Sequence, residues 1–170
     1  MKRSKKLRSL IVAFSILFIG GCAIGFTSIA DQQLRAASGE IKPIWIVGKS
    51  HVINSANGIQ IDMDISNLSD KTIKYATFYI LPFNAVGDVI VSEIDGKSLA
   101  ALTLTGPLDP GEYTTTVWEN VWYNLTFSCF EISEIDIEYM DSTTLSLSKA
   151  EVSKILMHST NKLISNSCTQ

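Results

Sequence analysis

Between residues 59 and 65 the chain alternates strictly between apolar and polar side chains. The apolar positions of this segment are Ile59, Ile61, Met63 and Ile65. Because successive side chains of a β-strand point to opposite faces, the alternation predicts a strand with one buried and one wet face. The preceding Asn57-Gly58 pair is typical of a two-residue hairpin turn. The strand is therefore expected to pair with a segment that ends near residue 53.

Further short apolar segments follow, separated by turn residues. Residues 73–83 carry β-branched and aromatic side chains on both faces, which predicts a strand at the centre of the fold. Residues 106–111, Gly-Pro-Leu-Asp-Pro-Gly, predict a turn because proline fixes φ and glycine supplies a positive φ. The other predicted strands cover residues 89–92, 99–104, 113–117 and 132–140. This pattern predicts a mostly β protein, with a two-layer antiparallel β-sandwich.

The period changes near the C-terminus. Ser148 followed by Glu151 is a capping-box pattern, and Val152, Ile155 and Leu156 then recur on one helical face. A short C-terminal helix is therefore predicted over residues 149–158. Residues 159–170 are mostly polar and are predicted to be a flexible tail. The folded domain is expected to span residues 44–158.

The first 30 residues have the pattern of an export segment. Five basic residues come first, an apolar run covers residues 10–19, and Gly20, Gly21 and Cys22 follow. That order is typical of a signal peptide. Residues 19–22, Ile-Gly-Gly-Cys, resemble the bacterial lipobox, whose cysteine receives a lipid. On this interpretation residues 1–21 are a lipoprotein-type signal peptide, Cys22 is the lipid attachment site, and residues 22–43 form a tether.

Two other interpretations of this segment remain open. Residues 28–30, Ser-Ile-Ala, fit the small-x-small pattern of ordinary signal peptidase, which would give a secreted protein. An uncleaved helix over residues 10–29 would instead anchor the chain in the membrane. All three interpretations place the folded domain in an extracytoplasmic location. The membrane is therefore an expected partner, through a lipid anchor or an N-terminal helix.

The remaining cysteines and the charge follow from this compartment. If Cys22 carries lipid, Cys129 and Cys168 are an even pair where disulfides are permitted. They either form a bridge that ties the C-terminal tail to the domain, or remain as a buried and a free thiol. Five of the 14 basic residues precede residue 22, so nine remain against 17 acidic residues, a net charge of −8. Such a surface repels polyanions, and a nucleic-acid partner is not expected.

Five segments in a fixed order suggest a family. They are residues 71–75 (Lys-Thr-Ile-Lys-Tyr), 82–88 (Pro-Phe-Asn-Ala-Val-Gly-Asp), 106–111, 118–124 (Trp-Glu-Asn-Val-Trp-Tyr-Asn) and 135–141 (Ile-Asp-Ile-Glu-Tyr-Met-Asp). Together they resemble a bacterial immunoglobulin-like domain family of unknown function, similar in style to the FxLYD-type sandwich domains. The resemblance covers about residues 50–145. It implies an immunoglobulin-like antiparallel β-sandwich and brings no catalytic residues.

Residues that could carry chemistry do not assemble into a recognisable motif. His51 and His158 lie far apart, and neither has the closely spaced partner that a zinc site needs. Alternating acids on two predicted strands are more typical of solvated sheet faces than of acid-base pairs. These acids are Asp62 and Asp64 on one strand, and Glu134, Asp136 and Glu138 on the other. No metal, cofactor or catalytic residue is therefore predicted.

Three aromatic residues, Trp118, Trp122 and Tyr123, leave two interpretations. In one continuous strand the tryptophans would share a face and Tyr123 would lie opposite. They either belong to the core or form an exposed binding face for a sugar, a peptide or a partner domain. The favoured hypothesis is a cell-envelope-tethered binding or interaction module without catalytic activity, with an envelope protein or glycan as partner. A small envelope enzyme or metal-binding protein, and a structural spacer, are the alternatives.

Overall fold

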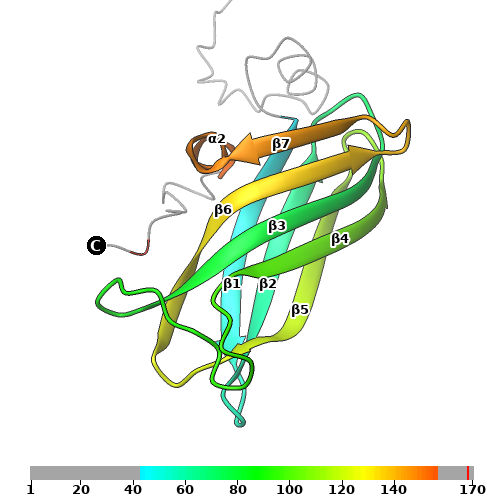
Figure 1. Cartoon of the computed structure of the whole chain (residues 1–170). Coiled ribbons are helices and arrows are strands. Elements are labelled where there is room, and N and C mark those ends of the chain that lie inside the picture. The colour runs from blue at the N-terminus through cyan, green and yellow to red at the C-terminus, as the bar shows by residue number, and fades with distance from the viewer. Residues whose placement is uncertain (1–42, 157–167, 169–170) are drawn as a thin grey trace, which may run out of the picture.

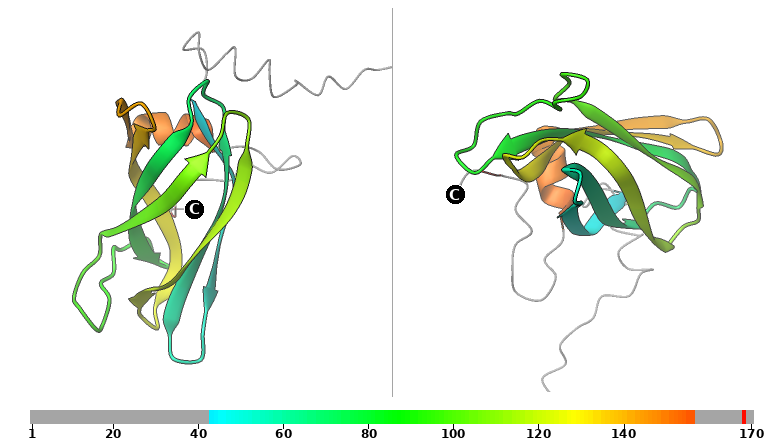
Figure 2. Two further views of the ribbon diagram at one scale, coloured as in Figure 1. Left: turned by 90° about the vertical axis from the view of Figure 1, so that its right-hand side faces the viewer. Right: turned by 90° about the horizontal axis from the view of Figure 1, so that it is seen from below.

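The computed structural model describes residues 43–156 and residue 168, which form two packed antiparallel sheets (Figure 1). The elements are β1 (Ile44–Ile53), β2 (Gly58–Asn67), β3 (Ile73–Asn84), β4 (Ala100–Leu108), β5 (Tyr113–Tyr123), β6 (Phe127–Tyr139), β7 (Thr144–Ser148) and α2 (Lys149–Ile155). One sheet has the order β1-β2-β5, and the other has the order β4-β3-β6-β7. The side view in Figure 2 shows them as two layers. The prediction of a mostly β sandwich with a short C-terminal helix is confirmed.

The strand order is that of an immunoglobulin-like sandwich. After β2 the chain crosses to the second sheet with β3, and β4 adds to one side of β3. The chain then returns to the first sheet, where β5 pairs with β2, and crosses again so that β6 pairs with the other side of β3. Lettered along the chain as in immunoglobulin domains, the two sheets are A-B-E and C′-C-F-G.

The core lies between the sheets and is built from the inward face of each strand. On β2 the four predicted apolar positions, Ile59, Ile61, Met63 and Ile65, are at most 1% exposed. The hairpin before β2 pairs residue 53 of β1 with residue 59, and Asn57 adopts the positive φ that this turn needs. The predictions of the β2 strand and of its pairing with the segment that ends at residue 53 are confirmed. The turn is longer than the predicted two residues, because Gly58 is already the first residue of β2.

The strand β3 occupies the centre of the four-stranded sheet, as predicted, between β4 and β6. Its inward side chains Phe78 and Ile80 are fully buried. Its outward side chains are not: Tyr75 is 38% exposed and Tyr79 is half-buried. Tyrosine tolerates such a position because its ring packs on neighbours while its hydroxyl reaches water. The apolar character of both faces therefore indicated a central strand, but not burial of both faces.

One predicted strand is absent, and one predicted turn begins too early in the sequence. Residues 89–92 form no strand, and only an isolated bridge joins Val89 to Phe83. The predicted turn over residues 106–111 starts later, because β4 continues through Gly106 to Leu108. Gly106 serves close packing: an added Cβ would lie 2.3 Å from the main-chain oxygen of Ile73. The positive φ of the turn comes from Gly111 instead.

Three further strand segments were not predicted. The strand β6 starts at Phe127 rather than at residue 132. The strand β5 extends beyond residue 117 to Tyr123, and β7 pairs with β6 at its outer edge. The chain passes directly from β7 into α2, where the main-chain N–H of Ser148 donates to the Glu151 carboxylate at 3.0 Å. Val152 and Ile155 of α2 are fully buried, as the helical period predicted. The helix ends at Ile155, with extended backbone at residue 156, rather than at residue 158.

Two Asn-Leu-Ser/Thr sequences end β2 and β5 in the same way. The side-chain oxygen of Asn67 accepts hydrogen bonds from the N–H and hydroxyl of Ser69, and that of Asn124 accepts the same pair from Thr126. The amide nitrogens of both asparagines donate to main-chain carbonyls. These turns satisfy main-chain groups that the ending strand leaves without a partner, so their role is structural.

Candidate functional site

Several predicted features lie outside the described residues. They are the export segment with Cys22, the tether up to residue 42, His158, and the tail apart from Cys168. In the described part of the chain, no helix is long and apolar enough to span a membrane. Pro43, the first described residue, accepts a hydrogen bond from the N–H of Leu68, and β1 starts beside it. Residue 43 therefore lies at the end of the sandwich where β2 ends and β3 begins.

The two tryptophans of the proposed binding face belong to the interior of the sandwich. Trp122 is 2% exposed, and its indole N–H donates to the main-chain oxygen of Ser98 at 2.8 Å. Trp118 is half-buried against the core, and its indole N–H donates to the oxygen of Thr103 at 3.2 Å. Both indoles thus reach from one sheet to the edge of the other. The prediction of an exposed face is wrong for Trp122, because the open side of the sandwich needs a large side chain to close it.

An irregularity in β5 lies between these tryptophans. Ile61 of β2 faces Trp118, and Ile59 faces Trp122, so β5 contains two more residues than β2 over this stretch. Asn120 in the irregular stretch has a φ of 54° and is exposed. An even number of extra residues leaves both indoles on the inward face. Tyr123 follows in a half-buried position.

Cys129 and Cys168 form a disulfide with an S–S distance of 2.09 Å. Of the two interpretations that the cysteine count left open, the structure has the bridge. It joins β6 to a residue close to the end of the chain, 39 positions later. The main-chain N–H of Cys168 also donates to the carboxylate of Glu131 at 2.9 Å. The end of the chain is therefore held against the outer side of β6 by a covalent bond and a hydrogen bond.

A charged cluster surrounds this attachment point. Glu131 is 6% exposed and accepts a hydrogen bond from Lys149 at 2.6 Å. Burial by itself would raise the pKa of Glu131, but the hydrogen bonds from Lys149 and Cys168 and the nearby positive charges outweigh it and lower the pKa. Lys49 on β1 donates to the main-chain oxygen of Phe130 at 2.9 Å and lies 4.7 Å above its ring. Burial lowers the pKa of Lys49 to about 8, against the attraction of Glu131.

The outward face of the four-stranded sheet carries rows of hydroxyls and carboxylates. In one row, Thr103, Thr77, Asp136 and Ser146 are register partners on four adjacent strands. Thr77 and Thr103 share a hydrogen bond of 3.0 Å, and Ser146 donates to Asp136 at 2.5 Å. The phenol of Tyr79 also hydrogen-bonds Asp136, which raises the pKa of Tyr79 above its usual value. An open depression of about 560 Å³ lies over this face.

The other acidic positions behave as parts of a solvated, hydrogen-bonded surface. Asp62 accepts from Gln60, and Asp64 accepts from Thr115, both at 2.7 Å on the outer face of the three-stranded sheet. The ring of His51 packs edge-on against Phe127, and its pKa is lowered by burial and by Lys49. Within residues 43–156 and 168, no three His, Cys, Asp or Glu side chains are grouped so that they could hold a metal ion.

The end of the sandwich farthest from residue 43 carries a feature that the sequence patterns did not reveal. The long connection between β3 and β4, residues 85–99, lies there beside the β1–β2 and β5–β6 turns (Figure 1). Six apolar side chains of this connection and of the β5–β6 turn are 49–80% exposed. We call them the distal patch: Val86, Val89, Val91, Ile94, Leu99 and Leu125. Strands of up to 13 residues separate the patch from residue 43 by roughly 40 Å.

The burial of residues 89–92 follows hydropathy only in part, because Ile90 packs against the core but the valines on either side of it do not. Val89 and Val91 are 50% and 49% exposed, whereas Ser92 is 4% exposed. Ser92 is retained inside because its N–H donates to the oxygen of Lys97 at 2.8 Å. Its hydroxyl also accepts from the N–H of Tyr123 at 3.4 Å. The buried polar residue is thus satisfied, whereas Val89 and Val91, which precede it, are left half-exposed.

Comparison with known proteins adds little to these observations. No protein-family model matches the chain, and no curated protein does. Among solved structures, the chain is similar to the Bifidobacterium adolescentis GH3 beta-glucosidase, with 15% identity and a TM-score of 0.31 over 62% of this chain. The matched region spans 17% of that enzyme's length.

Proposed function

We propose that the protein is a non-catalytic interaction module held on the outer side of a bacterial membrane, with its binding surface at the end away from the anchor. The observation that carries the proposal is the distal patch, which a fixed loop presents to solvent roughly 40 Å from the tether. Monomeric soluble domains seldom expose apolar side chains in such concentration, and such patches mark interaction sites. An anchored domain gains reach if its contact surface lies at the far end.

Two further observations support an extracytoplasmic location. The first 22 residues have the order of a lipoprotein signal peptide, and a disulfide joins Cys129 to Cys168. Structural disulfides persist mainly in oxidising compartments outside the cytosol. In the same proposal, the domain belongs to the bacterial immunoglobulin-like family that the sequence resembles. An envelope protein is its partner.

The location is tested by intact mass spectrometry of the protein extracted from membranes. The expected species begins at Cys22 and carries the added mass of a lipid. A species that begins at Asp31 without lipid would show that the protein is secreted rather than tethered. A cytosolic species that retains Met1 would refute the proposal. The interaction is tested by native electrophoresis after gentle extraction. A protein that migrates only as a monomer, even after chemical cross-linking in intact cells, would contradict an interaction module.

A further inference from the structure

We propose that the distal patch binds a protein surface that has an apolar centre surrounded by lysine and arginine side chains. This inference rests on the proposed function and names the chemistry of the partner. Three properties of the patch favour such a partner: its fixed backbone, its negative charges without ion-pair partners, and its position relative to the tether.

The backbone beneath the patch is already fixed in the free protein. The N–H of Ile90 donates to the oxygen of Pro82 at 3.1 Å, and the N–H of Glu93 donates to the oxygen of Tyr123 at 2.8 Å. The amide of Asn124 holds the oxygen of Val91 at 2.9 Å. The loop is thus tied to β3 at its start and to the end of β5 at its middle. Binding does not have to order it, which removes a large part of the usual cost of association.

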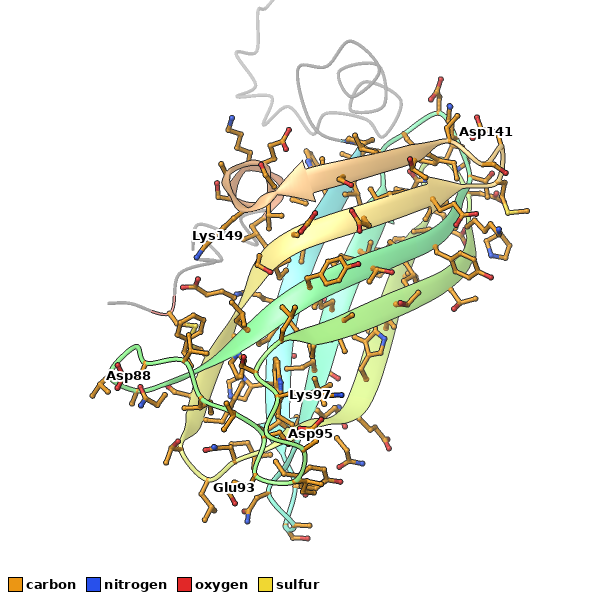
Figure 3. All side chains as sticks on the ribbon, viewed as in Figure 1. Asp88, Glu93, Asp95, Lys97, Asp141 and Lys149 are labelled. Carbon is orange, nitrogen blue, oxygen red and sulfur yellow. A yellow bond between two sulfur atoms is a disulfide. The ribbon has the colours of Figure 1, made fainter. Side chains whose placement is uncertain are left out.

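The charges around the patch are mostly negative. Figure 3 shows Asp88, Glu93, Asp95 and Lys97 on this loop, at the end of the domain opposite Asp141. Three carboxylates against one amine give the loop a net charge of −2. Within the described part of the chain, none of the three carboxylates forms an ion pair. Complementary potentials steer and orient association, so the matching partner surface is basic around its apolar centre.

Other occupants fit this chemistry less well. Two copies meeting through the patch would bring their three carboxylates together, and like charges at an interface disfavour that pairing. A membrane with anionic lipids would repel the same carboxylates, and membrane-binding surfaces carry basic residues instead. On the proposed tethering, the patch also points away from the membrane that holds the protein.

The test places a photo-reactive phenylalanine analogue at single positions of the full chain in the cells that make it. Positions 94 and 125 probe the patch, position 140 is an exposed control at the tether end, and position 79 probes the sheet face. The expected result is a covalent adduct with another protein at positions 94 and 125. Its yield should be at least about tenfold above that at position 140, since contacts at the centre of an interface dominate binding. The cross-linked peptide should contain apolar residues next to lysine or arginine.

A charge test accompanies the position test. The pair Glu93→Lys and Asp95→Lys should reduce the adduct at position 94 about tenfold or more, because each reversal replaces attraction by repulsion. The matched control Asp70→Lys, an exposed acid at the tether end, should leave the adduct unchanged. If the adduct still forms at the same yield in the double variant, the proposal of a basic partner surface is overturned.

The remaining outcomes separate this inference from the proposed function. An adduct with a second copy of the chain, with lipid, or in equal yield at position 140 overturns the inference. An adduct with another protein at position 79 alone also overturns it but leaves the proposed interaction module intact, with the sheet face as its site. If no adduct forms at any of the four positions, both the inference and the proposed function are refuted.

Discussion

Replacing Lys49 with methionine is expected to stabilise the domain at neutral pH. The amine of Lys49 is largely buried between β1 and β6, and burial lowers its pKa from 10.5 to about 8. A shift of that size corresponds to roughly 3 kcal/mol of cost for keeping the buried amine protonated at pH 7. Methionine has a similar length and carries no charge. It loses the hydrogen bond to the oxygen of Phe130, which offsets about 1 kcal/mol of the gain. The expected net gain for Lys49→Met is about 2 kcal/mol.

The pH dependence gives this prediction a second readout. The pKa of Lys49 in the folded state lies below its value in the unfolded chain. Between about pH 8 and 10.5 the unfolded chain therefore binds more protons than the folded protein, and the contribution of Lys49 to stability rises with pH. Below pH 8 the cost is present in full. The advantage of the methionine variant should thus be largest at pH 7 and should vanish by about pH 10.

Urea unfolding followed by tryptophan fluorescence at pH 7 and pH 10 measures both effects, as the difference between wild type and variant. The difference removes the contributions of other titrating groups, which the two proteins share. Lys154→Met on the exposed side of α2 is the matched control and should change little at either pH. The reasoning is refuted if Lys49→Met destabilises the protein at pH 7, or if its effect is the same at both values.

Three further predictions concern the disulfide, an asparagine turn and the distal patch. Replacing Cys129 and Cys168 with serine should lower the free energy of urea unfolding by up to about 4 kcal/mol, because the bridge closes a long loop; a loss below about 1 kcal/mol would contradict this chain-entropy reasoning. Asn67→Ala should cost about 2–3 kcal/mol in thermal unfolding, since two main-chain carbonyls lose their donor; an unchanged midpoint would show that the turn contributes nothing. Ile94→Asp should leave the free energy of urea unfolding within about 0.5 kcal/mol of wild type, because the Ile94 side chain is 71% exposed; a large loss would mean that Ile94 is held by packing.

Sequence patterns correctly predicted the elements whose signals lie within their own residues. In β2 the period of two is regular, and the turn that contains Asn57 joins it directly to β1. Each signal is contained in a few consecutive residues, so no knowledge of distant neighbours is needed. The capping pattern at Ser148 is local in the same sense, and it correctly gave the start of α2.

The features that were missed depend on contacts with other segments of the chain. The strand β7 has only two apolar residues, Leu145 and Leu147, and it becomes a strand because β6 offers a free edge. The burial of Trp122 similarly depends on Ser98, which supplies an acceptor from the connection just before β4. Local patterns showed that Trp118 and Trp122 share a face. They could not show that this face closes the sandwich.

The exposure of the distal patch is also a feature that local sequence patterns did not predict. Residues 89–92 alternate in burial, as a strand would, but the polar Ser92 faces inward and the valines face outward. Hydropathy gives the period of such a segment and assigns its apolar side to the core, because that is the arrangement that stabilises an isolated domain. Here each exposed valine forgoes roughly 1–2 kcal/mol of burial. The chain retains this unfavourable arrangement on a loop that its hydrogen bonds hold in one conformation, so flexibility does not account for the exposure. Reversals of local preference of this kind concentrate where a surface serves function rather than folding, which is the reason to search for the partner at this end of the domain.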